Sequence, residues 1–398
     1  MTAEACFSKP RLEKMRRVLE SHVERGEVAG VVTLLERRGE THLSAFGYKS
    51  LERREPIGTD TLFRIASMSK PITAVAALIL VEECRLRLDE PLDGLLPELA
   101  NRRVLKRIDG PLDDTEPARR PLTLRDLLTF RLGHGVIVGP DRYPIQKEST
   151  RLAIGGLKPR TPHSPDEWLR QFAKLPLMYQ PGERWLYHTG SDVLGVLVAR
   201  ASGQPFETFL QERIFEPLGM RDTGFTVPAE KLGRLSSCYR LNPTGALELY
   251  DDARESQWSQ PPAFPSGGGG LISTIHDYLA LGRMLLRQGS YPGGRILSRT
   301  TVEAMTTDQI TPGQKAVSEF FPGFWDHTGW GLGLSMITRR DGGAASPGQF
   351  GWSGAYGTTW ICDPREDLVA ILMIQRLDLG PTAIQSDFLT LTYQSFDD

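Results

Sequence analysis

The chain has 398 residues, 40% of them hydrophobic and 24% charged, and its 47 basic and 49 acidic residues leave a net charge of −2. This length gives room for two or three structural units and for a core that needs no disulfide or metal. The balanced charge gives no electrostatic footprint for nucleic acid or for an anionic membrane. Among the basic residues, ten are lysines and thirty-seven are arginines, and this scarcity of lysine bears on the site below.

The cysteines and histidines carry no metal or redox signature. The four cysteines include no close pair, and the seven histidines never fall in HExxH spacing, so we expect neither a disulfide framework nor a zinc site. The N-terminus lacks the apolar core of a signal peptide. The longest apolar run, residues 72–81, is too short to span a bilayer. These features predict a cytoplasmic protein with no membrane segment.

The first ninety residues alternate helix and strand signals. Leu12, Met15 and Leu19 recur at three- and four-residue spacing and predict an amphipathic helix over 9–26. Two strand-like runs follow at 29–36 and 42–46. A helix is then expected over 67–83; it is apolar nearly all round and should therefore be buried.

The middle of the chain differs from its two ends. Residues 88–205 combine Pro/Arg-rich loops with helical stretches, which indicates a helical insertion. After a run of four glycines the signals return to helix and strand: a helix near 272–289, strands within 329–337, 350–364 and 368–375, and a helix at 384–396. We therefore expect one α/β domain, formed by 1–87 and 206–398, which is split by the helical insertion 88–205.

Ser67-Met68-Ser69-Lys70 is the most informative tetrad. Serine and lysine three apart on a helix project from the same face. At the start of a helix, unpaired backbone N–H groups favour an anion, so a serine oxygen there can attack a carbonyl. Lys70 lies in an apolar stretch, where desolvation lowers the pKa of an amine and makes it a usable base. The alternative for Ser67 is a simple N-cap.

Two further segments carry candidate residues. Tyr187 follows a Pro-Gly turn and an aromatic cluster; packing is its simplest role, but a nearby ammonium would favour its phenolate and let it shuttle protons. Gly351-Trp352-Ser353-Gly354-Ala355 precedes a strand. Glycines there allow a substrate to lie against the backbone, and the N–H of Ala355 is a candidate oxyanion donor beside that of Ser67. The alternative is an ordinary Gly-rich strand entry.

In this order, SMSK, a Tyr after PGxxWxY, GGGGLISTIHDYL and a W-S-G-A strand resemble the serine β-lactamase-fold superfamily. This superfamily includes class C β-lactamases, D,D-peptidases and family VIII carboxylesterases. The resemblance implies an antiparallel sheet flanked by helices, with the active site at the junction with the helical insertion. It also implies Ser67 as the acylated nucleophile, Lys70 and Tyr187 as the proton-transfer pair, and the N–H groups of Ser67 and Ala355 as the oxyanion hole, with no cofactor and no metal.

Two departures from the superfamily pattern point to a subgroup. Trp352-Ser353-Gly354 stands where β-lactamases and D,D-peptidases usually have Lys-Thr-Gly, and the last lysine of the chain is Lys315. The missing cation would pair with a substrate carboxylate, whereas Trp352 offers an apolar wall for a neutral group. Tyr187-His188-Thr189 likewise replaces the usual Tyr-x-Asn. Both changes resemble family VIII carboxylesterases, so Trp352, Ser353 and Gly354 are expected to contact a small neutral ester.

The sequence contains one other candidate nucleophile and two candidate histidine bases, and it leaves several alternative functions open. Ser353 is a near miss to the G-x-S-x-G elbow, but that elbow requires a strand–Ser–helix turn, so Ser353 is rejected as nucleophile. His134 and His188 are set aside, because the Ser/Lys/Tyr pattern needs no histidine base. The expected function is a serine carboxylesterase acting through an acyl-enzyme. The alternatives are a weak β-lactamase, a D-aminopeptidase or amidase, an acyltransferase of the same fold, and a non-catalytic scaffold.

Overall fold

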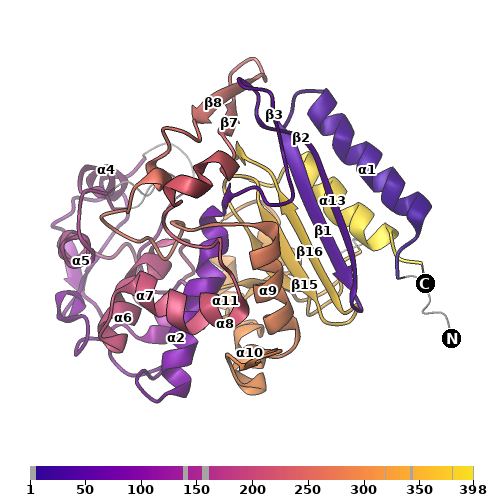
Figure 1. The fold of residues 1–398 in the computed structure, drawn as a ribbon. Helices are drawn as coiled ribbons and strands as arrows, with labels where there is room; N and C mark the ends of the chain where they lie inside the picture. Colours follow the sequence, from indigo (N-terminus) through magenta and orange to yellow (C-terminus); the bar gives the residue numbers. More distant parts are fainter. Residues whose placement is uncertain are drawn as a thin grey trace.

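The computed structural model describes residues 6–137, 142–154, 161–318, 320–340, 344–378 and 380–397. The chain is built on one large sheet with helices on both faces (Figure 1), and every pair of neighbouring strands in it is antiparallel. The predicted fold class is therefore confirmed. In spatial order the strands are β12 (Thr328–Trp330), β13 (Ser335–Ile337), β14 (Phe350–Ser353), β15 (Thr359–Asp363), β16 (Leu368–Met373), β1 (Gly30–Arg37), β2 (Glu40–Ser50) and β3 (Glu55–Pro56).

Alternating residues of β1 divide the core into two layers. Val31 and Leu35 pack in the cluster that contains the apolar faces of α1 (Lys9–Glu24) and α13 (Ala383–Gln394). Val32 and Leu34 belong instead to the larger cluster with α2 (Ser69–Glu82) and α9 (Ile275–Leu286). Successive side chains of a strand point to opposite faces. A strand covered on both faces is thus buried along its whole length, as β1 is.

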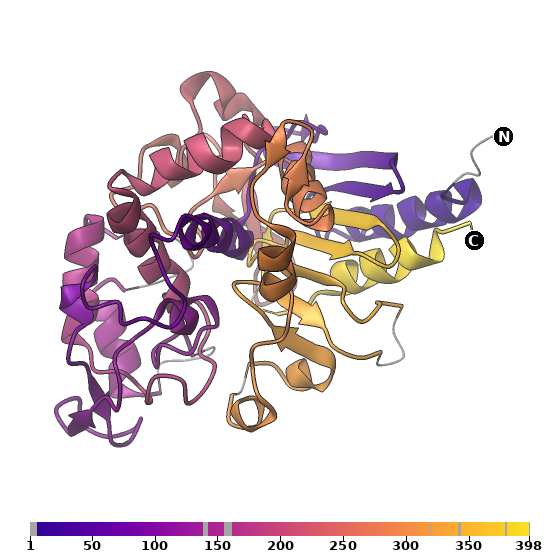
Figure 2. The ribbon, with the colours of Figure 1, turned by 90° about the horizontal axis from the view of Figure 1, so that it is seen from below.

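Helix α2 lies at the centre of the molecule. Every residue from Ser69 to Leu80 is buried, as the apolar sequence predicts. In Figure 2, α2 has the sheet on one side and the segment containing α6 (Thr189–Ser202) on the other. A helix covered all round has no solvent face, which is why its sequence shows no amphipathic stripe.

The segment 88–205 is mostly helical where it is described. It holds α3 (Leu124–Leu128), α4 (Pro144–Arg151), α5 (Pro165–Lys174) and α6, together with the short pair β5 (Arg103–Leu105) and β6 (Thr115–Pro117). Figures 1 and 2 place these helices on the side of α2 away from the large sheet. Residues 138–141 and 155–160, which belong to the loops expected there, lie outside the described residues. The division into two domains stays a prediction.

The remaining elements are short. They are β4 (Phe63–Arg64) paired with β9 (Ile272–Ser273); β10 (Ser290–Tyr291) with β11 (Gly294–Arg295); β17 (Arg376–Leu377), β7 (Cys238–Leu241) and β8 (Leu247–Asp251) in a small sheet; and α7 (Phe206–Leu210), α8 (Glu216–Leu218), α10 (Arg299–Met305), α11 (Pro312–Ala316) and α12 (Phe324–His327). In the described ranges, no helix combines the length and the apolar character that a bilayer crossing requires.

The strand run expected at 329–337 is interrupted. It forms β12 and β13, joined by a turn in which Gly333 has a φ of +90°. A Cβ on Gly331 would lie 2.0 Å from the carbonyl oxygen of Met305. Glycine is required at both positions, because neither leaves room or conformational freedom for a side chain.

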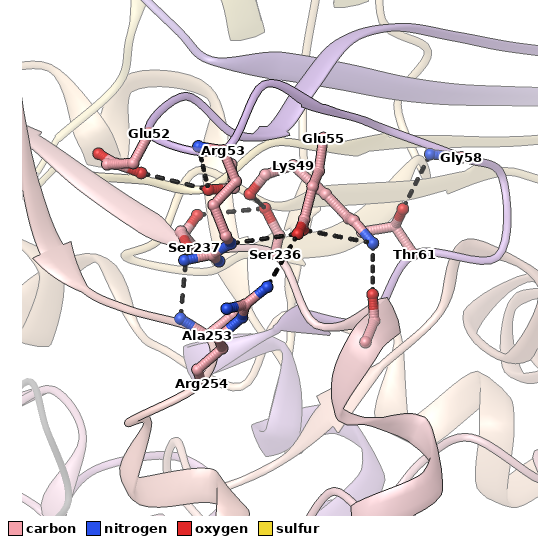
Figure 3. A network of polar contacts seen from close by, with 12 residues as sticks. Lys49, Glu52, Arg53, Glu55, Gly58, Thr61, Ser236, Ser237, Ala253 and Arg254 are labelled. Carbon is pink, nitrogen blue, oxygen red and sulfur yellow. Dashed lines mark hydrogen bonds and ion pairs between the residues drawn. The ribbon is translucent and has the colours of Figure 1, made fainter.

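A polar network ties the β2–β3 edge to the segment around β7 and β8 (Figure 3). Arg53 bonds Glu55 at 3.2 Å, and Glu55 also meets Arg254 at 3.4 Å. Arg53 further bonds Asp252 at 3.1 Å. Exposed pairs of this kind contribute about 0.2–1 kcal/mol each. The same segment also supplies a buried pair: Asp251 binds the fully buried Arg64 at 2.5 Å. Polar contacts of this segment therefore extend to Arg64, which lies three residues before Ser67.

Strand β14 lies very close to the turn that precedes α2. A Cβ on Gly354, the residue after β14, would lie 2.3 Å from the carbonyl oxygen of Ile65 and 2.5 Å from Oγ1 of Thr358. Backbone atoms cannot give way at that distance, so only glycine lets the end of β14 touch this turn.

We predict that Gly354→Ala lowers the free energy of unfolding by about 1–3 kcal/mol, because the new methyl group overpacks this contact. The measurement is urea unfolding. Gly313→Ala is the matched control, since no atom lies within 4 Å of a Cβ at Gly313 in α11; it should change the free energy by less than about 0.5 kcal/mol. Equal effects of the two substitutions would contradict the contact.

Candidate active site

Ser67 lies in a tight turn immediately before α2. Residues Ala66–Met68 form a 3₁₀ turn, and the helix itself begins at Ser69, whereas the sequence placed Ser67 at the start of the α-helix. The N-cap of α2 is Met68, and Ser67 makes no capping bond, so the N-cap alternative is wrong. Ala66 has a φ of +43°, a left-handed conformation that is uncommon for a residue with a side chain and is often found at functional sites.

Lys70 is fully buried and meets Ser67, as the tetrad predicts. Its Nζ lies 2.9 Å from Oγ of Ser67, 2.6 Å from the carbonyl oxygen of Gly268 and 3.1 Å from Nδ1 of His188. Residues three apart eclipse each other in a 3₁₀ turn, which favours the contact between Ser67 and Lys70. The amine thus has three partners, each from a different segment of the chain.

The environment of Lys70 makes it a base at neutral pH. Burial lowers the pKa of its amine to about 7, and the charge of Asp192 opposes that shift. Desolvation disfavours the ammonium, while a nearby carboxylate favours it. Near pH 7 a large fraction of Lys70 is therefore the neutral amine, which can accept a proton.

Tyr187 lies between Lys70 and Trp352. The indole Nε1–H of Trp352 donates to the Tyr187 hydroxyl at 2.7 Å, and this hydroxyl is also hydrogen-bonded to Ser67. Nζ of Lys70 is 4.6 Å from the centre of the Tyr187 ring. Burial raises the pKa of Tyr187 above its ordinary value, against the effect of both hydrogen bonds. The phenol keeps its proton at neutral pH, and this corrects the expectation that a neighbouring ammonium would favour the phenolate.

An aromatic cluster holds the Tyr187 ring in place, as the residues before it suggested. Its edge faces Phe130 at a centroid distance of 5.7 Å, and the ring stacks with Trp185 at 5.6 Å. Phe320 lies at 4.9 Å. Such pairs restrict the ring to one orientation and add to the energy of burial.

The sequence predicts a strand after Trp352 and Ser353, and β15 does follow them, but the two residues also lie inside a strand, as the last two of β14. Alternation along the strand separates their side chains. The Trp352 ring reaches Tyr187, whereas Ser353 is exposed and shares a hydrogen bond with Thr359 at 3.2 Å. A turn and then β15 follow Ser353, with no helix, which fits its rejection as nucleophile. Its expected contact with a substrate stays a prediction, as does that of Gly354.

Two backbone donors of the site are open. Among the hydrogen bonds of the described residues, none has the N–H of Ser67 or of Ala355 as its donor. The carbonyl of Ala355 is held by the N–H of Asp378 at 2.8 Å, and Gly354 brings this turn against Ile65, two residues before Ser67. Unpaired N–H groups are what an oxyanion requires. Their role as an oxyanion hole stays a prediction.

His188 belongs to this cluster, although the Ser/Lys/Tyr pattern in the sequence needs no histidine base. Nδ1 faces Lys70, and Nε2 lies 3.2 Å from Oδ2 of Asp192. Asp192 is buried and follows His188 by four residues, at the first turn of α6. That i, i+4 spacing is the sequence signal that could have found the pair. His134, by contrast, is buried outside the cluster, and burial lowers its pKa to about 3.

A cavity of about 320 Å³ opens beside the glycine run that follows residue 266. Its apolar lining includes Phe225, Trp258 and Phe264, and it reaches Gly270, two residues beyond the Gly268 carbonyl that contacts Lys70. No group of three or more His, Cys, Asp or Glu side chains placed to bind a metal occurs in the described part of the chain. The groups within hydrogen-bonding distance of Nζ of Lys70 are the Ser67 hydroxyl, the His188 imidazole and the Gly268 carbonyl.

The chain is similar to known proteins over most of its length. Residues 15–392 match the sequence model of the Beta-lactamase family. The chain is 41% identical over 358 residues to protein Rv1367c of Mycobacterium tuberculosis, covering 88% of this chain and 86% of that one. It is 32% identical over 367 residues to esterase EstB of Burkholderia gladioli, with 87% and 86% covered. Acyltransferase calJ of Penicillium decumbens is 28% identical over 365 residues, with 87% and 83% covered.

The fold is also that of a solved structure. EstCE1, described as a hydrolase with promiscuous acyltransferase activity, superposes with a TM-score of 0.81 over 96% of this chain and 98% of its own, at 23% identity. At that identity the likeness shows the fold. Together, the family match and the curated relatives support a hydrolase or acyltransferase with a serine β-lactamase-type fold.

We predict that the rate at which a fluorophosphonate labels Ser67 rises with pH to a plateau, with a midpoint near 7. The reason is that only the neutral Lys70 amine can take the Ser67 proton, and the pKa of that amine is about 7. The measurement is the labelling rate from pH 5 to 9, read by mass spectrometry of the intact protein. A rate that is still rising steeply at pH 9, as the higher pKa of an ordinary lysine would require, would contradict the shifted pKa.

Proposed function

The chain belongs to the Beta-lactamase family, and we propose that it is a serine carboxylesterase that cleaves small neutral esters through an acyl-enzyme. The observation that carries the proposal is the contact of 2.9 Å between Oγ of Ser67 and the buried Nζ of Lys70. A serine hydroxyl is a weak nucleophile unless a base removes its proton. Lys70, with a pKa of about 7, is that base.

Acylation begins with proton transfer from Ser67 to Lys70. As Oγ bonds to the ester carbonyl carbon, the Lys70 amine takes the hydroxyl proton and becomes an ammonium. The carbonyl oxygen becomes an oxyanion, which the open N–H groups of Ser67 and Ala355 can bind. The C–O bond to the alcohol then breaks. The protonated Tyr187 hydroxyl, bonded to Ser67, gives its proton to the leaving alkoxide and is reprotonated from the Lys70 ammonium.

Deacylation is the same sequence in reverse, with water in place of the alcohol. As the water oxygen attacks the acyl carbon, the Tyr187 hydroxyl takes a proton from water and passes its own proton to the neutral Lys70 amine. The bond from the acyl carbon to Oγ of Ser67 breaks, and the proton returns to that oxygen. Serine, lysine and tyrosine are thus regenerated in their starting states.

Trp352 supports a neutral ester as the substrate class. In many relatives of this fold a lysine at this position pairs with a substrate carboxylate, whereas Trp352 offers a half-buried ring with its N–H already donated to Tyr187. A substrate carboxylate would meet no cation at Trp352, so the free-energy cost of its desolvation there would not be offset by an ion pair. The esterase activity named for EstB, at 32% identity, agrees with this substrate class.

Acyl transfer to an alcohol is the second candidate function, because acyltransferase calJ is a relative over 87% of the chain. The two reactions share the acyl-enzyme and differ only in whether water or another alcohol accepts the acyl group. Product analysis with an ester in the presence of a primary alcohol separates them. A new ester formed faster than free acid would favour the transferase.

We predict that Ser67→Ala lowers kcat/KM for p-nitrophenyl butyrate by about a thousandfold or more, because no other described group replaces the nucleophile. The control is Ser44→Ala, a serine on β2 outside the cluster, which should retain activity within about twofold. Turnover of more than a few per cent in folded Ser67→Ala would end the proposal. Failure of a fluorophosphonate to label Ser67 in the folded wild type would favour a scaffold role.

We predict that the wild type prefers esters to β-lactams. The ratio of kcat/KM for a cephalosporin to that for p-nitrophenyl butyrate should be well below one, because the cephalosporin carboxylate meets Trp352 in place of a cation. Steady-state kinetics with both substrates in one buffer measure it. A ratio above one would favour the amide-cleaving alternatives, a weak β-lactamase or a D-aminopeptidase.

A further inference from the structure

We propose that His188 and Asp192 form a positioning pair that aims the lone pair of the neutral Lys70 amine at the Ser67 hydroxyl. This inference rests on the proposed function, because it explains how Lys70, the base of the proposed reaction, is oriented. The chain of contacts runs from Ser67 to Lys70, from Lys70 to His188 and from His188 to Asp192, at 2.9, 3.1 and 3.2 Å.

The hydrogen-bond inventory of Lys70 fixes its orientation. A neutral amine has two N–H donors and one lone pair. The Gly268 carbonyl, 2.6 Å from Nζ, can only accept. If Nδ1 of His188 carries no proton it also can only accept, so it takes the second N–H. The lone pair is then left for the third partner, the Oγ–H of Ser67, which is the orientation that a general base requires.

Asp192 sets the tautomer of His188. Its carboxylate accepts from Oγ of Ser266 at 2.6 Å and from the N–H of Gly268 at 3.0 Å, both at Oδ1. Oδ2 faces Nε2 of His188. Although burial opposes ionisation, the contacts with His188, Ser266 and Gly268 hold the pKa of Asp192 below its usual value. An ionised carboxylate needs a donor, so the imidazole proton sits on Nε2 and Nδ1 is bare.

The backbone around His188 is built for this placement. His188 has φ +84° and ψ −63°, a conformation that costs energy for any residue with a side chain and persists where surrounding contacts impose it. A Cβ on Gly268 would lie 2.9 Å from Cε1 of the His188 ring. Only glycine therefore admits the ring. Gly268 in turn gives its carbonyl to Lys70 and its N–H to Asp192, so the four residues form a closed ring of contacts.

The titratable groups that face His188 are Lys70 from α2, Asp192 from α6 and the neighbouring Tyr187, whose ring centre is 6.0 Å away. Burial and the charge of Lys70 lower the pKa of His188, against the effect of Asp192. The lowered pKa favours the neutral imidazole near pH 7. The imidazole positions Lys70 as an acceptor and does not itself take the serine proton.

The test compares His188→Ala, which removes the acceptor, with His188→Asn, whose Oδ1 can occupy the place of Nδ1. With p-nitrophenyl butyrate, His188→Ala should lower the plateau of kcat about a hundredfold with KM within about threefold. The acid limb of the dependence of kcat on pH should move to lower pH. The reason is that His188→Ala removes an acceptor that stabilises the Lys70 ammonium, so the pKa of Lys70 falls. His188→Asn should recover at least about tenfold of that loss.

Asp192→Asn tests the same positioning role by changing the tautomer of the His188 imidazole. An amide N–H facing Nε2 would place the imidazole proton on Nδ1, against the N–H groups of Lys70, so kcat should again fall about a hundredfold. Circular dichroism and thermal unfolding show which variants fold, and Asp192→Asn decides if His188→Ala does not.

The positioning role would be overturned if folded His188→Ala or Asp192→Asn kept the wild-type dependence of kcat on pH, with the same plateau and the same acid limb. It would also be overturned if kcat of His188→Asn were no higher than that of His188→Ala. Full activity of Ser67→Ala would overturn the proposed function instead, so the two failures are distinguishable.

Discussion

A buried amine governs the design of this site. Lys70 has no exposed surface, and removing a cation from water costs several kcal/mol unless it is paired or gives up its charge. The protein meets that cost in part by lowering the pKa of Lys70 to about 7 and in part by surrounding Nζ with three hydrogen-bonding partners. The burial that disfavours the ammonium also leaves a large fraction of the Lys70 amine unprotonated, and able to accept a proton, near pH 7.

The rest of the fold brings segments that are distant in the sequence together around this amine. Helix α2 carries Lys70 between the sheet and α6, the loop before α6 brings Tyr187 and His188, and β14 brings Trp352. Glycines allow the close approach: Gly354 at the turn before Ser67 and Gly268 beneath the His188 ring. The absence of side chains at these two positions thus shapes the cluster as much as the side chains around them do.

Local patterns in the sequence predict much of this structure. The spacing of Leu12, Met15 and Leu19 predicts α1, the apolar run after Lys70 predicts a buried α2, and the separation of three residues predicts the contact of Lys70 with Ser67. The protonation state of Tyr187 and the bond from Trp352 depend on contacts between residues 165 positions apart, which no local pattern encodes. The i, i+4 spacing of His188 and Asp192 is a local pattern, but the contact of His188 with Lys70 is not, because the two residues are 118 positions apart.

The most direct test of the account is chemical trapping of the acyl-enzyme. Wild-type protein mixed with an excess of p-nitrophenyl butyrate and quenched in acid within one turnover should carry the mass of one butyryl group, and peptide mapping should place it on Ser67. Lys70→Met should form this adduct at least about a hundredfold more slowly, because the base is lost. A butyryl group on another residue, or ester turnover with no adduct and no dependence on Lys70, would contradict the account.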